Sequence, residues 1–492
     1  MTTKSAVSTK GDGTKIVDKK FFIHTTIIIV IMFGFGLLPT ISTITRQGMQ
    51  ILGIFISCIY AWTIGFLDWP SILAMIAVAL TGYAPLAQIV GMTFGNQVLW
   101  LVMFAMIFCY AIEKTGLLPI IARKILNIKF ARRGPWSLAF IFMIAAMIMG
   151  FLTTNALTVI VILWKVFEEM VEELKIAHDD PYVASVLIMI VIAATAGSVI
   201  APYTGFVLIS FGFYNTLVGG IPINTLSYAG VILAINLAIY LAFIFVFKYL
   251  LKINVSFEGL RKYSKEETSL NMRQKIMLGL VLLLAICMML PHVLPEGSLI
   301  REFLLTKLGG LGVMISITII FSIISNQGET FLDMSTGFKE GIPWGLFMMV
   351  GTALMTASVL ADESLGITEA LMHALDPILK DKSLFILLTI LSIFSMALTN
   401  ILNNNACLAI FAPISIVVIQ NAGGNPQTIV ILLALTCMLG YITPGASAMG
   451  ALLNGHEWLN AKQIYKYGGI TFLIMAVVLI AIGIPLVKFV FV

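Results

Sequence analysis

The sequence predicts an all-α polytopic membrane protein with about eleven transmembrane spans, built from two inverted repeats that each contain a re-entrant helical hairpin and a broken transmembrane helix. The first observation behind this prediction is composition, because 60% of the 492 residues are hydrophobic and only 11% are charged. A soluble chain of this length needs far more charged residues to cover its surface. The second is that two apolar segments in each half are interrupted by polar residues, Gly or Pro at matching positions. The third is an uneven distribution of Lys and Arg among the predicted loops, which fixes an orientation in the membrane.

The first half of the chain is predicted to contain a tail, one extra helix and the first repeat. Residues 1–20 are polar and basic and would form a cytoplasmic tail. Residues 21–251 would comprise the first helix and the first inverted repeat, with a hairpin over 135–175 and a broken helix over 182–216. The first apolar run is too long for a signal-peptide core, so we expect it to remain as a helix.

The second half repeats this plan after a polar cytoplasmic linker over residues 252–275. Residues 276–492 would form the second inverted repeat, with a hairpin over 383–421 and a broken helix over 427–453. The other helices are expected over 21–40, 48–66, 69–86, 96–128, 223–251, 276–292, 308–325, from 343 onward and over 464–490. An odd number of spans would separate the repeats, so their hairpins would enter from opposite sides and meet near the bilayer midplane.

The positive charges predict the orientation of the protein and its location. With the N-terminus inside, most Lys and Arg fall on the cytoplasmic side, as the positive-inside rule requires. We therefore expect a multi-pass protein of the cell membrane, surrounded by lipid, whose net charge of +5 needs no nucleic-acid partner. The five cysteines lie singly in apolar runs and are expected to be free. No His or Cys pair has the spacing of metal ligands, so no cofactor is expected.

The two hairpin tips are the predicted binding site. Asn403–Asn405 interrupt the apolar arms of the second hairpin, and Thr153–Asn155 interrupt those of the first. A buried amide without a hydrogen-bond partner costs about 1–3 kcal/mol, so these groups need partners. Each tip begins a helical arm whose free N–H groups attract an anion, while the preceding arms end in carbonyls near Gly150 and Leu402 that suit a small cation such as Na⁺. The alternative is that these residues only cap helices or join them.

Further polar residues lie in the broken helices and in two long helices. The residues that could complete the site from the broken helices are Ser198, Thr204, Thr443 and Ser447, beside Pro202 and Pro444. Glu113 and Glu363 are the acids most deeply placed in apolar segments, and each could relay a proton. Because a glycine follows each of them within three residues, a bend at a helix break is the alternative interpretation.

At the two hairpins the sequence resembles the divalent anion:sodium symporter family, part of the wider ion-transporter superfamily. That family carries Ser-Asn-Thr at each tip, with a proline further along the second arm, and (Ser/Thr)-Pro-Pro-Asn in each broken helix. The matching stretches here are Thr154-Asn155-Ala156, Asn403-Asn404-Asn405 with Pro413, Ala201-Pro202-Tyr203-Thr204 and Thr443-Pro444-Gly445-Ala446. Glu113 to Leu117 also resembles the family, whereas Ala156 and Ala201 lack its hydroxyl groups.

The resemblance implies a homodimer that works by an elevator mechanism, in which a scaffold holds the dimer while the hairpins and broken helices move with the cargo. Asn155 and Asn404 match the asparagines at the centres of the family's sodium sites. The residues expected to complete those sites are Gly150, Thr154, Ile200, Leu402, Ile442 and Pro444. The residues expected to bind substrate are Thr154, Asn155, Asn403, Asn404, Asn405 and Thr443.

The function that these features favour is sodium-coupled symport of small organic anions, di- or tricarboxylates such as citrate, with Na⁺ as the coupling ion. The alternative is a proton-coupled or exchange carrier of the same superfamily for another small anion or an amino-acid-like solute, in which Glu113 or Glu363 titrates. An intramembrane enzyme would need a nucleophile–base pair or an acid pair at midplane depth, and the sequence shows neither. A channel is disfavoured because two occluding hairpins suit alternating access better than a continuous pore.

Overall fold

The computed structural model describes residues 7–9, 15–17, 19–153, 155–220, 222–253, 255, 269–326, 328–379 and 382–491. Most of the predicted tail, residues 256–268 of the predicted linker, and Thr154 lie outside the described residues. The described chain is almost entirely helical and has the composition of a membrane protein. The predicted fold class, an all-α polytopic membrane protein, is confirmed.

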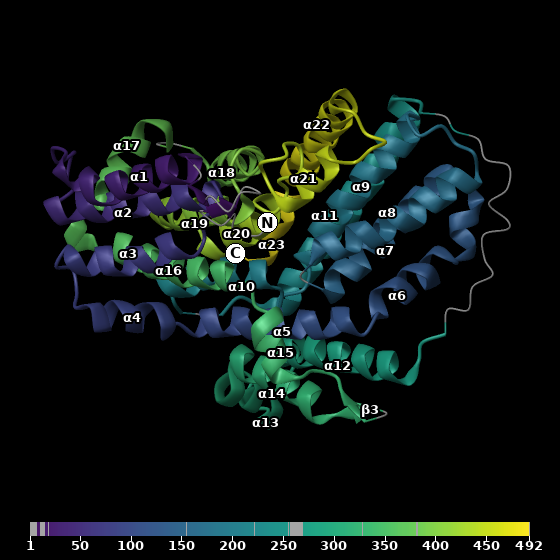
Figure 1. Ribbon diagram of the computed structural model, residues 1–492, viewed down its shortest axis with the longest axis horizontal. Helices are drawn as coiled ribbons and strands as arrows, with labels where there is room; N and C mark the ends of the chain where they lie inside the picture. Colours follow the sequence, from purple (N-terminus) through teal and green to yellow (C-terminus); the bar gives the residue numbers. More distant parts are fainter. Residues whose placement is uncertain are drawn as a thin grey trace.

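The first half of the described chain contains helices α1 to α11 (Figure 1). Their bounds are α1 (Lys19–Gly34), α2 (Arg46–Thr63), α3 (Trp69–Leu80), α4 (Leu86–Phe94), α5 (Gln97–Lys114), α6 (Leu117–Leu126), α7 (Pro135–Leu152), α8 (Ala156–Glu173), α9 (Pro181–Ser198), α10 (Gly205–Leu217) and α11 (Thr225–Phe245). The segment predicted as a hairpin consists of α7 and α8, and the one predicted as a broken helix consists of α9 and α10. The helix predicted over 69–86 instead ends at Leu80, because Gly82 adopts a left-handed φ of 77°, and α4 follows unpredicted.

The second half contains helices α12 to α23. Their bounds are α12 (Met272–Met289), α13 (Leu299–Glu302), α14 (Gly309–Ile323), α15 (Met334–Glu340), α16 (Trp344–Leu360), α17 (Ile367–Leu379), α18 (Leu384–Leu398), α19 (Asn404–Asn421), α20 (Pro426–Thr436), α21 (Ala448–Asn454), α22 (Ala461–Val478) and α23 (Ile484–Val490). Here α18 and α19 form the hairpin, and α20 and α21 form the broken helix. Two antiparallel strand pairs that the sequence does not predict are β1 (Val7–Thr9) with β2 (Lys15–Val17), and β3 (Ser325–Asn326) with β4 (Glu329–Thr330).

The number of candidate spans is close to the predicted number. By length and composition, nine helices of the described chain could cross a membrane, or ten if the bent pair α15–α16 is counted as one span. The sequence predicts about eleven. Four further apolar helices, α3, α10, α18 and α20, have only 10–17 residues. They are shorter than the roughly 20 residues that a spanning helix needs. Helices α10, α18 and α20 are short because a hairpin tip or a helix break interrupts their apolar segments, and α3 is short because the chain turns at Gly82.

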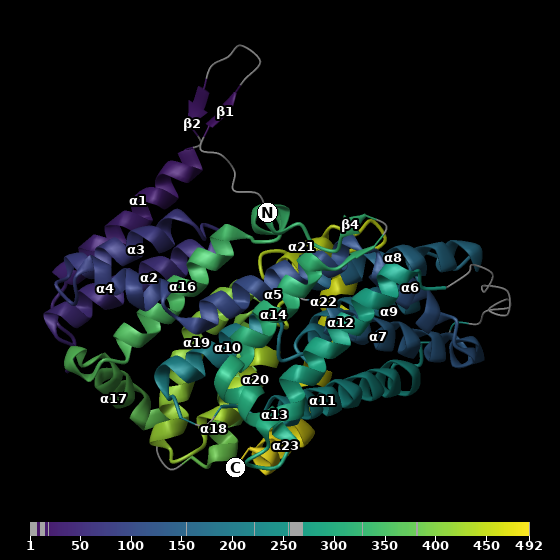
Figure 2. The same ribbon diagram turned by 90° about the horizontal axis from the view of Figure 1, so that it is seen from below.

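The two halves make equivalent contacts with each other, as a two-fold relation between them requires. Helix α10 of the first broken helix packs against α19 and α20, and its counterpart α21 packs against α8 and α9. In the same way α5 packs against α14, and α16 packs against α3. Figures 1 and 2 show α10 and α20 near the middle of the molecule, with α6 to α9 toward one end and α1 to α4 toward the other. This reciprocity is the two-repeat architecture that the sequence predicts.

A glycine hinge interrupts an equivalent long helix in each half. Helix α5 is followed by Gly116, with φ of 63°, before α6 begins, and α16 is followed by Gly366, with φ of 68°, before α17 begins. Both φ values lie in the left-handed region that favours glycine. The sequence leaves open a bend near Glu113 and Glu363, and the structure breaks the helix beside both residues.

The second hinge is held by residues from the first half of the chain. The backbone N–H of Thr45 donates to the carbonyl of Leu365 at 3.0 Å, and the Tyr83 hydroxyl donates to Asp362 at 2.8 Å. Hydrogen bonds from Ser364 and from Tyr83 hold the pKa of Asp362 below its usual value. The hinge therefore depends on an ionised carboxylate at neutral pH.

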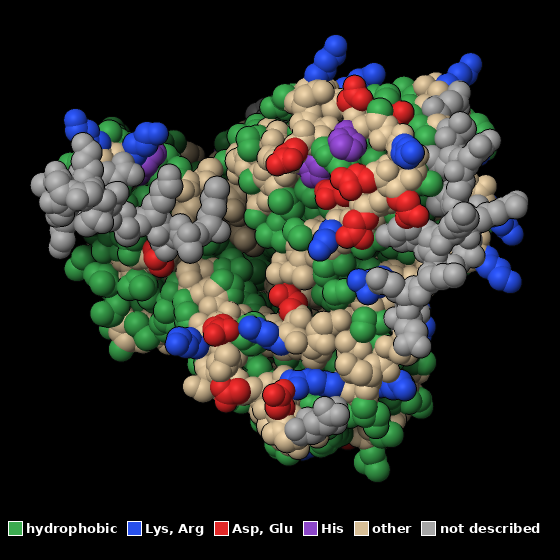
Figure 3. Space-filling model, turned by 45° about the vertical axis from the view of Figure 1, so that its right-hand side comes forward, with side chains coloured by type: hydrophobic (Ala, Val, Ile, Leu, Met, Phe, Trp, Pro, Cys, Tyr) green, Lys and Arg blue, Asp and Glu red, His purple; other side chains and the backbone are tan. Residues whose placement is uncertain are grey.

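The end of α8 that is remote from its tip is bonded to the loop after α21. His456 and Glu168 form a hydrogen bond of 2.8 Å, and the His178 ring stacks on Trp458 with ring centroids 4.0 Å apart. Figure 3 shows histidines among acidic side chains on one side of the molecule, next to extensive hydrophobic surface. These contacts fix the first hairpin to an element of the second repeat.

Candidate functional site

Two of the asparagines at the tip of the second hairpin, Asn403 and Asn404, have different roles. Asn403 caps α19 by accepting a hydrogen bond from the backbone N–H of Asn405 at 2.9 Å. Capping is the alternative role that the sequence leaves open for the tip residues. Asn404 is only 5% exposed, and its Nδ2 donates to the carbonyl of Met438, in the break between α20 and α21, at 3.2 Å. Asn404 therefore points away from its own helix end and into the broken helix.

Oxygen atoms gather beside Asn404. Its Oδ1 lies 2.9 Å from Thr399 Oγ1, which in turn lies 2.6 Å from the carbonyl oxygen of Cys437. The Thr399 hydroxyl has one proton and cannot fully satisfy both acceptors. A Cβ built on Gly440 would lie beside Asn404 Oδ1, 2.5 Å from the Thr399 carbonyl oxygen and 3.2 Å from its hydroxyl oxygen. Gly440 therefore packs closely against these oxygens, which gather with one hydroxyl proton among them, and a small cation beside them would supply the missing positive charge.

Asn400 joins the end of the first arm to the broken helix. Its Oδ1 accepts from the backbone N–H groups of Tyr441 and Ile442 at 3.1 and 2.9 Å. Its Nδ2 donates to the carbonyls of Met396 and Leu439 at 2.9 and 3.2 Å. The side chain thus makes four hydrogen bonds, the number its amide supports. Asn400 is absent from the predicted site, although an asparagine inside an apolar arm needs partners and is itself a signal.

Three residues of the second broken helix, Ile442, Thr443 and Pro444, are predicted to belong to the site at this tip. The Thr443 hydroxyl donates to the carbonyl of Asn400. The carbonyl of Ile442, a predicted cation ligand, accepts from Asn454 Nδ2 at 3.1 Å. Pro444, also predicted as a cation ligand, is exposed. The side chain of Asn404 contacts Thr399 and the carbonyl of Met438, and the roles of Ile442 and Pro444 as cation ligands stay predictions.

The tip of the first hairpin is organised around a carboxylate. Thr153 is fully buried, donates its hydroxyl to Glu113 Oε1 at 3.2 Å and accepts the backbone N–H of Asn155, also at 3.2 Å. Asn155 is the N-cap residue of α8, but its side chain accepts no capping hydrogen bond. The hydrogen bonds that connect this tip to Glu113 therefore run through Thr153.

Two glycines let the first hairpin and the first broken helix approach closely. A Cβ on Gly150 would lie 2.7 Å from the carbonyl oxygen of Ala194 and 2.9 Å from the backbone nitrogen of Ser198. A Cβ on Gly197 would lie 2.6 Å from Met147 Cα. Both distances are too short for a real Cβ, so only glycine fits at this crossing. Gly150, predicted as a cation ligand, therefore also has a packing role.

A hydroxyl from each broken helix holds the equivalent residue of its hairpin. Tyr203 donates to the carbonyl of Phe151 at 3.0 Å in the first repeat, and Thr443 donates to that of Asn400 in the second. Phe151 and Asn400 each stand three residues before the first residue of the matched tip motifs. The same kind of hydrogen bond therefore connects each hairpin to its broken helix, although the residue types at the two tips differ.

The predicted site residues fall into two clusters, one at each tip. Within the described ranges, no hydrogen bond joins Asn155 and its neighbours to Asn404 and its neighbours, and the predicted meeting of the tips stays a prediction. Ile200 is buried at 5% exposure beside the first cluster, and Leu402 is half-buried in the second tip. Thr154, predicted for both kinds of site, lies outside the described residues.

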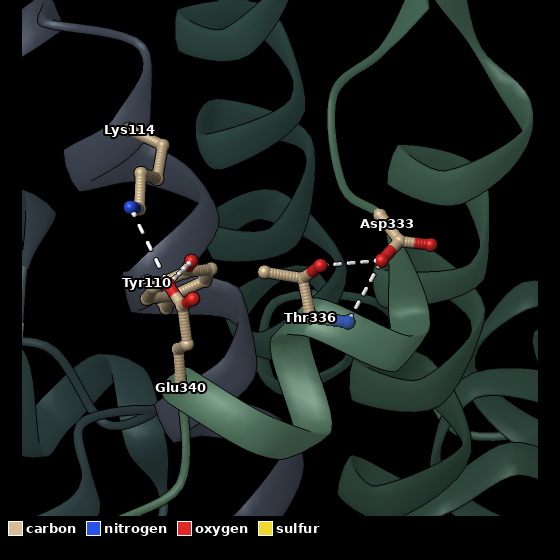
Figure 4. Close-up of polar contacts among 5 residues, drawn as sticks. All are labelled: Tyr110, Lys114, Asp333, Thr336 and Glu340. Carbon is tan, nitrogen blue, oxygen red and sulfur yellow. Dashed lines mark hydrogen bonds and ion pairs between the residues drawn. The ribbon is translucent and has the colours of Figure 1, made fainter.

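A polar cavity of about 550 Å³ lies beside the end of α5 and has none of the predicted site residues in its wall. Tyr110 donates to Glu340 of α15, which also forms an ion pair of 3.5 Å with Lys114 (Figure 4). Arg273 and Glu329 form a second ion pair in the wall, at 2.9 Å. Each cation in the wall is thus paired with an acid, and the remaining acid, Asp333, caps α15 by accepting from the backbone N–H of Thr336. Because none of the predicted site residues lines this cavity, we place the candidate site at the tips.

Comparison with known proteins identifies the family. Residues 58–436, more than half of the chain, match the CitMHS family, described as citrate transporters. The chain belongs to this family. A curated relative, an uncharacterized transporter of Haemophilus influenzae, is 22% identical over 145 residues. That match spans 30% of this chain and 31% of the relative, so less than a third of the relative's length is covered.

Two solved structures share the fold of this CitMHS protein. The YdaH transporter of Alcanivorax borkumensis, described as having an unusual topology, matches with a TM-score of 0.57 and 14% identity, over 90% of this chain and 98% of that one. MtrF of Neisseria gonorrhoeae, described among antimetabolite efflux pumps, matches with a TM-score of 0.56 and 12% identity, over 94% and 97%. Family and fold together make the protein a multi-pass membrane transporter rather than an enzyme, in agreement with its resemblance to the ion-transporter superfamily.

Proposed function

We propose that this CitMHS protein couples the movement of Na⁺ to that of small organic anions, namely di- or tricarboxylates such as citrate. The observation that carries the proposal is the group of oxygens at the second tip. Asn404 Oδ1, the Thr399 hydroxyl and carbonyl, and the Cys437 carbonyl lie together there with one hydroxyl proton among them. A small cation would supply the positive charge that these acceptors lack.

The anion would bind at the helix ends that follow the tips. The N-termini of α8 and α19 present free N–H groups and the positive ends of their dipoles. Asn155 does not cap α8 with its side chain, which leaves the first N–H groups of α8 available to a carboxylate. A cation that binds first makes the site more positive and raises its affinity for the anion. This order of binding gives the coupling a physical basis.

The driving force of such coupling is large enough for concentrative uptake. One net positive charge that enters gains about 2.3 kcal/mol for each 100 mV of membrane potential. A tenfold sodium gradient adds about 1.4 kcal/mol for each ion. A stoichiometry of about two or three sodium ions for each dianion would therefore concentrate the substrate by several powers of ten.

The proposed mechanism is of the elevator type within a homodimer in the cell membrane, with the N-terminus in the cytoplasm. The resemblance to the symporter family supports the homodimer and the sliding movement. The reciprocal packing of the two repeats supports alternating access, since two equivalent arrangements related by a two-fold axis can exchange roles. Cross-linking in native membranes would show a dimer if the proposal holds.

A second candidate function is that of a proton-coupled or exchange carrier. The observation that favours it is the position of Glu113, whose carboxylate accepts a hydrogen bond from the Thr153 hydroxyl at the first tip. An intramembrane carboxylate at a binding site can take up a proton in place of a cation.

Uptake into reconstituted vesicles separates the two candidates. Labelled citrate is offered with an inward sodium gradient, and in a parallel series Na⁺ is replaced by choline at the same pH. Sodium coupling predicts that uptake falls to background in choline, and unchanged uptake would reject it. A thermal-shift screen of carboxylates, sulfate and amino acids, with and without Na⁺, identifies the substrate, because a bound ligand raises the melting temperature.

A further inference from the structure

We propose that the thiols of Cys407 and Cys437 form a binding site for a metal ion that prefers sulfur ligands, such as Zn²⁺. Cys407 lies in the first turn of α19, three residues after Asn404, and Cys437 directly follows α20. Their sulfur atoms lie 3.7 Å apart. The inference goes beyond the proposed function, because it concerns a second ion that takes different ligands.

The two thiols come from two different elements of the second repeat. Cys407 belongs to the hairpin and Cys437 to the helix break, and 30 residues separate them in the sequence. Metal-binding motifs place paired cysteines only a few residues apart, so the sequence alone does not reveal this pair. Thiolates select Zn²⁺ and Cu⁺, whereas carbonyl and carboxylate oxygens suit Mg²⁺ and Ca²⁺. The pair is therefore chemically distinct from the oxygens beside Asn404.

The distances around Cys407 Sγ match those of a tetrahedral zinc ion. With Zn–S bonds of about 2.3 Å, two thiolates on one ion lie about 3.8 Å apart, and an oxygen ligand lies about 3.6 Å from each sulfur. The observed separation of the two sulfurs is 3.7 Å, and the carbonyl oxygen of Ser395 lies 3.5 Å from Cys407 Sγ. An ion could therefore take these three ligands with little movement of the protein.

The carbonyl of Ser395 can serve as the third ligand. It accepts one hydrogen bond, from the backbone N–H of Thr399 at 2.9 Å, and a carbonyl oxygen has two lone pairs. Within the described residues, no group of three or more His, Cys, Asp and Glu side chains could hold a metal ion. Two thiolates and one carbonyl leave the fourth position of the ion to water, as in zinc sites that remain open. We therefore expect a reversible site rather than a permanent structural one.

A disulfide is the first alternative use of the two thiols. Its sulfurs lie about 2.05 Å apart, so this pair would have to approach by about 1.7 Å, and an oxidant would have to remove two electrons and two protons. A metal ion requires the loss of two protons and no approach of the sulfurs. The second alternative is that the two thiols only pack against each other as small apolar groups. The observed separation favours the ion over the disulfide, and the experiment below separates the ion from packing.

The backbones of both cysteines are bonded to the second tip. The carbonyl of Cys437 accepts from the Thr399 hydroxyl at 2.6 Å, and the backbone N–H of Cys407 donates to the carbonyl of Asn403 at 2.8 Å. An ion held by both sulfurs would fix α19 to the helix break at the point where the proposed sodium ligands lie. We therefore expect the ion to inhibit transport. This consequence rests on the proposed function, whereas the binding of the ion does not.

The site is closed to solvent and lies close to the tip. Both cysteines are fully buried, and Asn404, one turn closer to the tip, is 5% exposed. The tip residues Leu402, Asn403 and Asn405 are half-buried. An ion from solution would therefore reach the sulfurs past the tip, when the hairpin moves away from the helix break.

The test uses the full-length protein in lipid nanodiscs, treated with a chelator, with Zn²⁺ as the probe and Mg²⁺ as the control ion. Cys407→Ser and Cys437→Ser remove one sulfur each, and Cys58→Ser changes a fully buried cysteine of α2 as the matched control. Three quantities are measured. They are the zinc concentration at half of the maximal thermal shift, the number of zinc ions per chain by native mass spectrometry, and the protons released on binding by calorimetry in two buffers.

We expect wild type to bind one zinc ion at this site and to release about two protons, because thiols must be deprotonated to bind zinc. Cys407→Ser and Cys437→Ser should each raise the half-saturating zinc concentration at least about tenfold, since even the loss of an outer-shell partner of a metal ligand costs that much. Cys58→Ser should match wild type, and Mg²⁺ should give no thermal shift.

Uptake measures the consequence for transport. Reconstituted vesicles are loaded with zinc, and free zinc is removed before labelled citrate is added, because citrate itself binds zinc. We expect zinc to lower the sodium-driven uptake of wild type at least about tenfold, and that of Cys407→Ser less than about twofold.

Four results would overturn or separate the proposals. No thermal shift of wild type with zinc, or the same half-saturating concentration in wild type and both tip variants, would reject the site. If a variant does not fold, the proton count of wild type decides, since binding without proton release rejects thiolate ligands. Zinc binding with unchanged uptake would keep the site and reject its effect on the tip. If sodium drives no uptake, the proposed function fails, and the zinc measurements still decide for or against the site.

Discussion

Replacing Gly440 with alanine places a methyl group at the point where the oxygens of the second tip converge. The added Cβ would stand 2.5 Å from the Thr399 carbonyl oxygen and 3.2 Å from its hydroxyl oxygen, and it would meet Asn404 Oδ1 as well. Alanine suffers no backbone strain at this position, because the φ of Gly440 is not among the positive values. The effect of the substitution is therefore the effect of the methyl group.

The neighbours of this methyl group cannot easily give way. One is a backbone carbonyl, and the amide oxygen of Asn404 is fixed because its nitrogen donates to Met438. Overpacking of this kind costs about 1–3 kcal/mol of unfolding free energy. The methyl group would also displace the oxygens of Asn404 and Thr399, and a cation that these oxygens bind during transport would lose its ligands. We therefore expect Gly440→Ala to abolish transport while the protein still folds.

The matched control is Gly445→Ala in the same helix break. Gly445 has no atom within 4 Å of the position of an added Cβ, so its substitution adds the same methyl group without a clash. The assay is sodium-driven uptake in reconstituted vesicles, with the melting temperature of each purified variant measured in parallel. We expect wild-type uptake from Gly445→Ala and background uptake from Gly440→Ala. Wild-type uptake by Gly440→Ala would show that this point is not part of the transport path.

Three other predictions follow from the contacts of the tips and the hinge. Asn155→Ala and Asn404→Ala should each reduce uptake to background with little loss of folded protein, as gel filtration and uptake assays would show, and near wild-type uptake would leave the residue with a structural role only. Asn400→Ala should lower the unfolding free energy by about 1–3 kcal/mol, because the N–H groups of Tyr441 and Ile442 lose their acceptor, and denaturant titration measures this loss. The pKa of Asp362 is lower in the folded protein, so its ionised form contributes stability above the ordinary aspartate pKa and loses it as the pH falls through the folded-state value. Tyr83→Phe removes one hydrogen bond that lowers this pKa, and the melting temperature of this variant should therefore change less than that of wild type between neutral pH and about pH 3.

The hairpins and broken helices could be predicted because their signal is local. Two apolar arms around a polar tip, and an apolar run with Gly and Pro inside it, have few other physical solutions in a membrane. The first hairpin predicted over 135–175 contains α7 and α8, which begin at Pro135 and end at Glu173. Its tip falls at Thr153–Asn155 because buried amides and hydroxyls disrupt the helix where other groups can bond to them.

The partners of the tips could not be predicted because they come from distant parts of the chain. Glu113 and Glu363 look alike in the sequence, since each precedes a glycine at the end of a long apolar helix. Only the packing of α5 brings Glu113 to the first tip, while Glu363 stays exposed. Thr399 and Asn400 are absent from the predicted site for a different reason, because they lie before the run of three asparagines that marks the second tip.

Both tips are hydrogen-bonded to their broken helices in the same way, but they differ in charge. This difference in charge gives a last prediction. The first tip holds a carboxylate, Glu113, whereas the described groups around Asn404 are amides, hydroxyls and carbonyls. Of these groups, only the carboxylate is a titratable acid.

Glu113→Gln removes that proton site while it keeps an acceptor for the Thr153 hydroxyl. If sodium drives transport through the second tip, uptake by this variant should remain dependent on sodium and lose most of its dependence on pH. If a proton drives transport through the first tip, the variant should lose concentrative uptake at every sodium concentration and retain only exchange of internal for external substrate. Uptake by Glu113→Gln with the sodium and pH dependence of wild type would contradict both expectations and would show that Glu113 takes no part in coupling.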